Sequence, residues 1–251
     1  MKKFAIVLVF IKLAFLACFS ILAISSCQTA SLSELETAPT NAATSTVTPN
    51  PTPNTTDDAI NRPVSEPYTG DLSIFEDQNR AKNLQIERVM DILKIKEGKN
   101  VADIGAGSGW FTTLAAKRVG EKGKVFAVEI NEEYITHIKN RAQKENFKNI
   151  ETVLGAEDNP KLAKDSVDAV LILKTYHEIA EPIKVLRNIR ASLRKDGLVG
   201  IIDKNGNGDD HGINKEKVND ELKRAGFVLK EEFDFTKADG MDYFLVFRAA
   251  K

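Results

Sequence analysis

Residues 101–111, with the sequence VADIGAGSGWF, carry the residue types and spacing that most directly predict binding chemistry. Three glycines at positions 105, 107 and 109 follow an apolar run that is typical of a β-strand. Glycine lets the backbone approach a ligand closely, and a helix that begins after the loop offers N–H groups to an anionic part of the ligand. The negative charge of Asp103 favours a ligand that also has a cationic part. The stretch therefore predicts a loop that holds a nucleotide-like ligand.

Two common classes of glycine-rich loop do not fit these residues. A phosphate-binding loop of the Walker A type needs a lysine followed by serine or threonine after its last glycine, whereas Trp110 and Phe111 follow Gly109. A dinucleotide-binding loop needs a third small residue at the position of Trp110, where an indole would obstruct the close approach of helix and strand. Phosphates and dinucleotides are therefore disfavoured as ligands.

The pattern from Asp103 to Gly109 resembles motif I of class I S-adenosylmethionine-dependent methyltransferases. Three stretches of the chain, 101–130, TYHEI at 175–179 and YFLVFR at 243–248, are similar to a group of uncharacterised bacterial members of that family. The resemblance covers residues 72–251 and implies S-adenosylmethionine as the cofactor. It also implies that the backbone of the motif lines the cofactor site, with these residues: Asp103, Gly105, Ala106, Gly107 and Gly109.

Further cofactor residues are expected after the next two strands. Glu129 ends the strand-like run KVFAVE, where an acid can accept hydrogen bonds from both ribose hydroxyls, and Ile130 lies beside it. In the enzymes that the chain resembles, an acidic or polar residue after the third strand meets the adenine amino group. Either Glu157 or Asp158 in the run GAEDNP fits that position.

The run LKTYHEIAEP after the fourth strand supplies the candidate catalytic residues His177 and Tyr176. Ligands of open α/β sheets lie beyond the carboxyl ends of the strands, so this run faces the same crevice as the glycine loop. His177 would act as a general base if the acceptor must lose a proton. A packing role for His177 stays open. The chain lacks the Asn/Asp-Pro-Pro-Tyr run that related nucleic-acid and glutamine methylases carry here, which disfavours those substrates.

No metal site is expected. The three histidines, His137, His177 and His211, are far apart in the sequence, and both cysteines lie near the N-terminus. The run DKNGNG at 203–208 matches the first half of a calcium loop, but its twelfth position is Asn214 and not glutamate. We interpret this run as a flexible loop, His211 as a capping or rim residue, and His137 as a surface residue.

From residue 71 onward, strand-like apolar runs alternate with helical patterns, which predicts an α/β domain with crossover helices. The last two strand-like runs have no helix between them and are expected to pair antiparallel. The prediction is a Rossmann-like, mainly parallel seven-stranded sheet with an antiparallel C-terminal pair. Strands are expected at 100–104, 124–129, 150–154, 167–173, 198–203, 227–235 and 243–249, and helices at 79–93, 110–119, after Asn131, from Pro182 to the Asp-Gly pair at 196–197, and at 215–225.

The N-terminal residues 1–26 combine a basic start with a long apolar run, which is typical of a secretory leader. The run ISSC, which ends at Cys27, resembles a bacterial lipobox, so Cys27 is the expected lipidation site; a plain transmembrane anchor with an incidental cysteine is the alternative. Residues 27–70 are rich in Ser, Thr, Pro and Asn and are expected to form a disordered tether. The folded domain is expected at 71–251, on the extracytoplasmic face of the membrane.

The combined expectation is a membrane-tethered methyltransferase that acts on a small-molecule acceptor, with a protein or a lipid as the less favoured acceptor. A net charge of −1 does not favour nucleic acid as a partner. The alternative is an exported, non-catalytic binding module that keeps the fold, because nucleotide-like cofactors are normally cytoplasmic.

Overall fold

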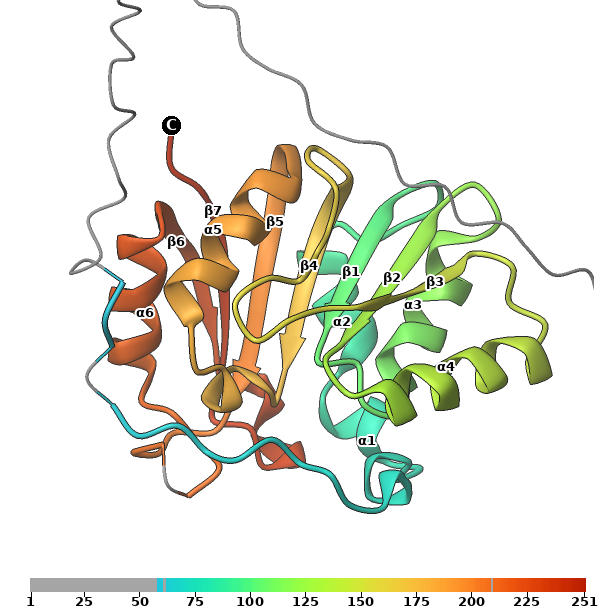
Figure 1. Cartoon of the computed structure of the whole chain (residues 1–251), viewed down its shortest axis with the longest axis horizontal. Helices are drawn as coiled ribbons and strands as arrows, with labels where there is room; N and C mark the ends of the chain where they lie inside the picture. Colours follow the sequence, from blue (N-terminus) through green and yellow to red (C-terminus); the bar gives the residue numbers. More distant parts are fainter. Residues whose placement is uncertain (1–57, 61, 209) are drawn as a thin grey trace, which may run out of the picture. The chain divides into compact units, whose positions relative to one another are not determined.

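The computed structural model describes residues 58–60, 62–208 and 210–251. They contain a seven-stranded sheet with helices packed on both of its faces (Figure 1). The expected leader, Cys27 and most of the expected tether lie outside the described residues. Within the described part of the chain, no helix has the length and apolar character needed to cross a membrane.

The strand order is β3-β2-β1-β4-β5-β7-β6. The first five strands pair in parallel, and β7 runs antiparallel to both β5 and β6. This arrangement confirms the predicted mainly parallel sheet with an antiparallel C-terminal pair. The strands are β1 (Asn100–Ile104), β2 (Lys124–Glu129), β3 (Ile150–Leu154), β4 (Val167–Leu173), β5 (Leu193–Asp203), β6 (Phe227–Phe233) and β7 (Tyr243–Ala249).

The register of the central strands places their carboxyl ends at one level. Ile104 of β1 pairs with Val128 of β2 on one side and with Ile172 of β4 on the other. The residues that follow these three strands therefore meet at the same edge of the sheet, as in other open α/β sheets.

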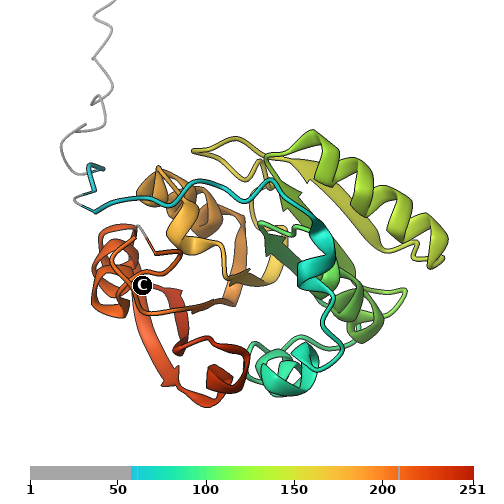
Figure 2. The same ribbon diagram turned by 90° about the horizontal axis from the view of Figure 1, so that it is seen from below.

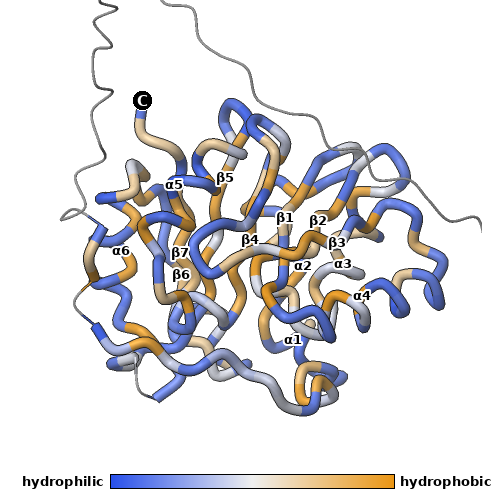
Figure 3. Tube along the Cα trace, in the orientation of Figure 1, coloured by the Kyte–Doolittle hydropathy of each residue, from blue (hydrophilic) through white to orange (hydrophobic). Residues whose placement is uncertain are grey.

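Two hydrophobic cores hold the helices on the sheet. Residues of α2 and α3 pack with Val101 and Leu171 on one face, and residues of α5 and α6 pack with Ala102 and Val170 on the other. Helix α4 is mostly hydrophilic (Figure 3) and buries only one side. The helices are α1 (Arg80–Asn83), α2 (Ile86–Ile92), α3 (Trp110–Val119), α4 (Glu132–Lys144), α5 (Pro182–Ser192) and α6 (Lys215–Arg224), with 3₁₀ turns η1 (Leu72–Phe75), η2 (Tyr176–Glu178) and η3 (Phe235–Asp239).

The expected helix at 79–93 is two short helices. Gln85 interrupts it with a left-handed backbone, φ 49°. This break lets Leu84 and Ile86, which would otherwise face different directions on one helix, both enter the core with 0% and 1% exposure.

Two strand boundaries also differ from the expectation. Strand β5 begins at Leu193, so the Asp-Gly pair at 196–197 lies within the strand and does not end the helix, which stops at Ser192. A register shift against β4 accommodates the extra residues. Strand β6 ends at Phe233, and Phe235 instead begins η3, where its ring packs against Phe244.

Residues 62–70, assigned to the tether from composition, instead pack against the domain, and we call them the N-terminal strap (cyan in Figures 1 and 2). Arg62 Nε lies 2.7 Å from Glu221 Oε1, with both side chains almost fully buried. The N–H of Ser65 donates to the carbonyl of His177 at 3.2 Å. The tether prediction is therefore wrong for this segment, because specific polar contacts compensate for its low hydrophobicity.

Candidate functional site

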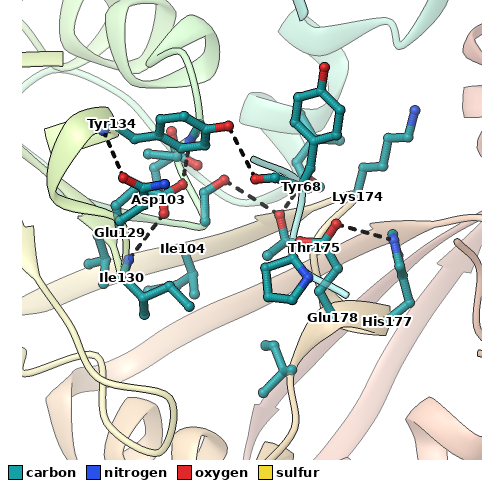
Figure 4. Close-up of a pocket in the computed structure, with 18 of the residues that line it drawn as sticks. Tyr68, Asp103, Ile104, Glu129, Ile130, Tyr134, Lys174, Thr175, His177 and Glu178 are labelled. Carbon is teal, nitrogen blue, oxygen red and sulfur yellow. Dashed lines mark hydrogen bonds and ion pairs between the residues drawn. The ribbon is translucent and has the colours of Figure 1, made fainter. Parts of the chain in front are cut away.

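A cavity of about 950 Å³ lies at the carboxyl ends of β1, β2 and β4. Much of its lining comes from the glycine loop after β1, the end of β2, residues between Leu173 and Ala180 at and after the end of β4, and the N-terminal strap (Figure 4). Residues of the loops after β3 and β5 and of η1, α1, α3, α4 and α5 complete it. Its volume lies near the upper end of the range of about 300–1,000 Å³ that is usual for ligand pockets.

The glycine loop has the backbone conformation that only glycine adopts without strain. Gly105, Gly107 and Gly109 have φ values of 70°, 54° and 76°. A Cβ atom at Gly105 would also collide with the side chain of Thr175, which follows β4. The N–H groups of Gly105 and Ala106 both donate to the carbonyl of Val128, which ties the loop to β2.

Asp103 lies at the end of β1 with 2% exposure and lines the cavity. One carboxylate oxygen accepts a hydrogen bond from the Thr112 hydroxyl at 2.6 Å, which joins the strand to the first turn of α3. Burial raises the pKa of Asp103 to about 7, and the hydrogen bond from Thr112 opposes that shift. Among the described residues no lysine, arginine or histidine forms an ion pair with this carboxylate. The positive charge of Arg80, which also lines the cavity, lowers the pKa of Asp103 without forming an ion pair with it. Asp103 therefore offers a cationic ligand a buried acid that no ion pair occupies.

Glu129 ends β2 on the opposite side of the loop and is 8% exposed. Its Oε1 accepts from the N–H of Gly107 at 2.6 Å, and its Oε2 accepts from the N–H of Ile130 at 3.1 Å (Figure 4). Burial raises the pKa of this carboxyl, and the backbone hydrogen bonds partly counteract that effect. Two carboxylates thus flank the glycine loop, as the sequence predicts.

The remaining predicted cofactor residues separate into two groups. Ala106, Ile130 and Glu157 line the cavity, and Ile130 is 46% exposed at its edge. Asp158 is not among the lining residues, and its carbonyl accepts from the side-chain amide of Asn188. The structure therefore brings Glu157, but not Asp158, to the predicted site.

His177 lies on the opposite wall of the cavity in η2 and is 1% exposed. Its Nδ1 lies 2.9 Å from both carboxylate oxygens of Asp203, the last residue of β5. Because the carboxylate also accepts from the N–H groups of His177 and Lys204, we assign the proton to Nδ1. The other ring nitrogen, Nε2, then carries the lone pair and lies 3.8 Å from Glu178 Oε1.

Tyr176 does not lie in the cavity, although the sequence analysis pairs it with His177 as a catalytic residue. Its ring is 0% exposed, and its hydroxyl donates to Glu221 Oε2 at 2.8 Å on the side of α6. Successive side chains of η2 point in different directions, so His177 faces the cavity and Tyr176 lies in the core. A catalytic role for the Tyr176 hydroxyl does not fit this position, so the prediction for Tyr176 is wrong.

Two residues that were not predicted from the sequence, Asp203 and Glu178, contribute to this wall. Asp203 anchors His177, and Glu178 lines the cavity, where burial raises its pKa to about 7. Asp203 could have been recognised as an acid at the end of a buried strand next to β4. Glu178 carried no comparable signal, since acidic residues are common in loops.

His211 also lines the cavity, and its ring centre lies 5.8 Å from that of His177 with the two rings nearly perpendicular. It does not cap a helix, because Asn214 is the N-cap of α6 and accepts from the N–H of Glu216. His137 is exposed on α4, as expected. His177 and His211 are thus far apart in the sequence but close in the fold, because the loop after β5 folds back over η2.

Comparison with known proteins identifies relatives of this chain. A family model described as a methyltransferase domain matches residues 95–237. A protein-L-isoaspartate O-methyltransferase from Methanococcoides burtonii is 28% identical over 52% of this chain and 61% of its own length. An arsenite methyltransferase from Halobacterium salinarum is 31% identical over 42% of this chain and 27% of its own. The matched part thus spans less than two thirds of either relative.

A solved structure shows the same architecture. The crystal structure of a SAM-dependent methyltransferase from Aquifex aeolicus superposes with a TM-score of 0.64 and 26% sequence identity. The match covers 71% of this chain and 98% of that one. The Aquifex aeolicus enzyme is named as dependent on S-adenosylmethionine, whose ammonium and sulfonium suit a cavity with two buried acids beside a glycine loop.

Proposed function

The chain belongs to the methyltransferase domain family, and on that premise we propose that it transfers a methyl group from S-adenosylmethionine to a small-molecule acceptor bound in the cavity. The observation that carries the proposal is the pair of buried carboxylates, Asp103 and Glu129, on either side of a glycine loop with left-handed backbone. Burying acids that form no ion pair is costly unless a ligand compensates them. A cofactor with two positive centres and two ribose hydroxyls supplies that compensation.

S-adenosylmethionine, when bound, supplies a methyl carbon that its sulfonium has already activated, so the protein contributes mainly positioning. Asp103 would hold the cationic amino-acid part, and Glu129 the ribose hydroxyls. Glu157 would meet the adenine amino group. Each of these residues lines the same cavity.

The acceptor side of the cavity is formed by His177, Glu178 and the N-terminal strap. His177 presents a lone pair on Nε2, because Asp203 holds the proton on Nδ1. The strap closes this side through the hydrogen bond from Ser65 to His177 and through the hydroxyl of Tyr134, which donates to the carbonyl of Tyr68 at 3.1 Å. A covered cavity favours a small acceptor over a protein surface, although the isoaspartate relative is named for a protein substrate.

We also propose that residues 1–26 export the chain, that Cys27 is acylated, and that the domain lies on the extracytoplasmic face of the membrane. The support is the basic start, the apolar run and the small residues before Cys27. A reporter fused to the C-terminus, together with mass analysis of the N-terminal peptide, tests this proposal. A reporter active only in the cytoplasm, or an unmodified Cys27, contradicts it.

Cofactor binding tests the proposed function directly. The full-length protein in detergent is titrated with S-adenosylmethionine, and the variants Asp103→Asn and Glu129→Gln are compared with wild type. We expect saturable binding that weakens by at least about 10-fold in each variant, since each loses a charged partner of the ligand. The control is Glu121→Gln, an exposed acid outside the cavity. Absence of binding to wild type would favour the alternative, an exported module that keeps the fold without catalysis.

A further inference from the structure

On the acceptor wall of the cavity, three potential metal ligands converge from two segments of the chain. His177, Glu178 and His211 each offer one ligand atom, and these atoms all lie within 4.8 Å of one another. The first two belong to η2, and His211 comes from the loop between β5 and α6. From this convergence we propose that the three side chains bind a divalent transition-metal ion, such as Zn²⁺, inside the cavity.

The donor set matches the chemistry of such ions. Two imidazoles and one carboxylate are the protein ligands of several catalytic zinc sites, and the same set also binds other first-row metals. Among the residues that the structure describes, His177 Nε2 accepts no hydrogen bond, and Glu178 Oε1 lies 3.8 Å from it (Figure 4). A nearly buried ring nitrogen beside a carboxylate is therefore available to a cation.

Asp203 gives the arrangement a second supporting feature. Its carboxylate lies 2.9 Å from His177 Nδ1 and is 0% exposed. Histidines that bind metals usually donate their other ring N–H to a carboxylate or a carbonyl, which fixes the tautomer and makes the ligating nitrogen more basic. The His177–Asp203 pair already has this geometry, and its orientation is independent of any ion.

The spacing permits coordination after a small movement. In a tetrahedral site the ligand atoms lie about 3.3–3.5 Å apart, because each is about 2.0–2.2 Å from the ion. His177 Nε2 and Glu178 Oε1 lie 3.8 Å apart, and all three ligand atoms lie within 4.8 Å of one another. His211 is exposed, so its ring can turn toward the other two ligands. His177 and Glu178 are held by η2 and form the fixed part of the site.

Three protein ligands leave at least one coordination position open. Because all three residues line the cavity, that position faces the space for the methyl acceptor. The ion would bind an oxygen or nitrogen donor of the acceptor and lower its pKa. This role rests on the proposed function, whereas the binding of the ion rests only on the three side chains. In the metal-bound form, His177 Nε2 coordinates the ion and does not act as a base.

Zinc binding is the primary test. Full-length protein, purified in detergent with a tag that contains no histidine, is freed of metal and dialysed against Zn²⁺. We expect one equivalent to bind, with affinity reduced by at least about 10-fold in His211→Ala and in Glu178→Gln. His137→Ala, the exposed histidine on α4, is the matched control and should bind zinc as wild type does. His211 is exposed, so its removal leaves the core intact.

Cobalt substitution tests the open position. The visible spectrum of the Co²⁺-loaded protein should change when azide, a small exogenous ligand, is added. An absence of stoichiometric zinc binding, or binding that is unchanged in His211→Ala, overturns the metal site, and a cobalt spectrum that is insensitive to azide overturns the open position. Binding of S-adenosylmethionine to the metal-free protein is measured in parallel. If the metal-free protein does not bind S-adenosylmethionine, the proposed function is contradicted, whereas the zinc-binding measurements still decide whether the metal site exists.

Discussion

The Nδ1 atom of His177 lies 2.9 Å from both carboxylate oxygens of Asp203, although the two residues are 26 positions apart in the chain. The contact joins η2 to the end of β5 in a part of the domain where both residues are almost completely buried. It determines which ring nitrogen of His177 is free toward the cavity. The chemistry of the acceptor wall therefore depends on a residue that does not itself line the cavity.

Asp203→Asn is expected to lower the free energy of unfolding by about 1–3 kcal/mol, because a buried carboxylate that accepts several hydrogen bonds is replaced by an amide that also carries donors. Chemical unfolding of the two proteins measures the difference. Asp220→Asn is the control, since Asp220 is an exposed acid in a surface pair with Arg224, and such pairs contribute about 0–1 kcal/mol. Equal stabilities of Asp203→Asn and wild type would contradict the anchoring role.

Gly105→Ala should destabilise the protein more than Gly240→Ala does. Both glycines have positive φ, 70° and 77°, so both substitutions carry backbone strain of about 1–3 kcal/mol. Only at Gly105 would the new Cβ also collide with Thr175, whereas at Gly240 no atom lies within 4 Å. Thermal unfolding compares the variants, and cofactor titration should show weaker binding for Gly105→Ala alone. Similar losses at the two positions would show that backbone strain accounts for the whole effect.

Cofactor affinity should rise with pH as Asp103 ionises around its pKa of about 7. The carboxylate, and not the neutral acid, attracts the cationic part of the ligand. Titrations of S-adenosylmethionine between pH 6 and pH 8 measure this dependence. Asp103→Asn should bind more weakly and lose the part of the dependence that Asp103 causes. An identical pH dependence in the variant would contradict the assignment.

Ionisation of Asp103 strengthens cofactor binding but lowers the stability of the unliganded protein. A carboxyl whose pKa is raised by folding holds its proton more tightly in the folded state, so stability falls as pH rises from the unfolded value of about 3.9 to the folded value of about 7. The stability of wild type relative to Asp103→Asn should therefore decrease across that window and level off above it. Chemical unfolding at several pH values checks the sign, and a difference that increases with pH would be inconsistent with it.

Arg62→Met should lower the free energy of unfolding by about 3–5 kcal/mol, since it leaves the buried carboxylate of Glu221 without its cationic partner. Adding Glu221→Gln in the same chain should recover part of the loss, because the uncompensated charge is removed. A double-mutant cycle measures the coupling. Lys122→Met, at an exposed pair with Glu97, should have little effect. If the two substitutions change the free energy of unfolding additively, the buried Arg62–Glu221 ion pair does not hold the strap on the domain.

Much of the sheet could be predicted from the sequence, since buried strands such as β4 are continuous apolar runs and the helices between them show a helical period. The cofactor side followed from the same pattern. Asp103 and Glu129 are the last polar positions of adjacent parallel strands, and parallel strands place their carboxyl ends at one edge. The local residue pattern and the parallel direction of the strands were enough to predict where Asp103 and Glu129 lie, because their positions do not depend on contacts between distant loops.

The acceptor side depended on tertiary structure. The approach of His211 to His177, the anchoring by Asp203, the inward turn of Tyr176 and the packing of Arg62 on Glu221 all join segments that are distant in the sequence. Each contact depends on how a loop or the strap folds back over the sheet, and loops carry no periodic pattern that reveals such a path. The sequence by itself therefore determined the sheet and the edge proposed to bind the cofactor, whereas only the folded chain decided which side chains face the proposed acceptor.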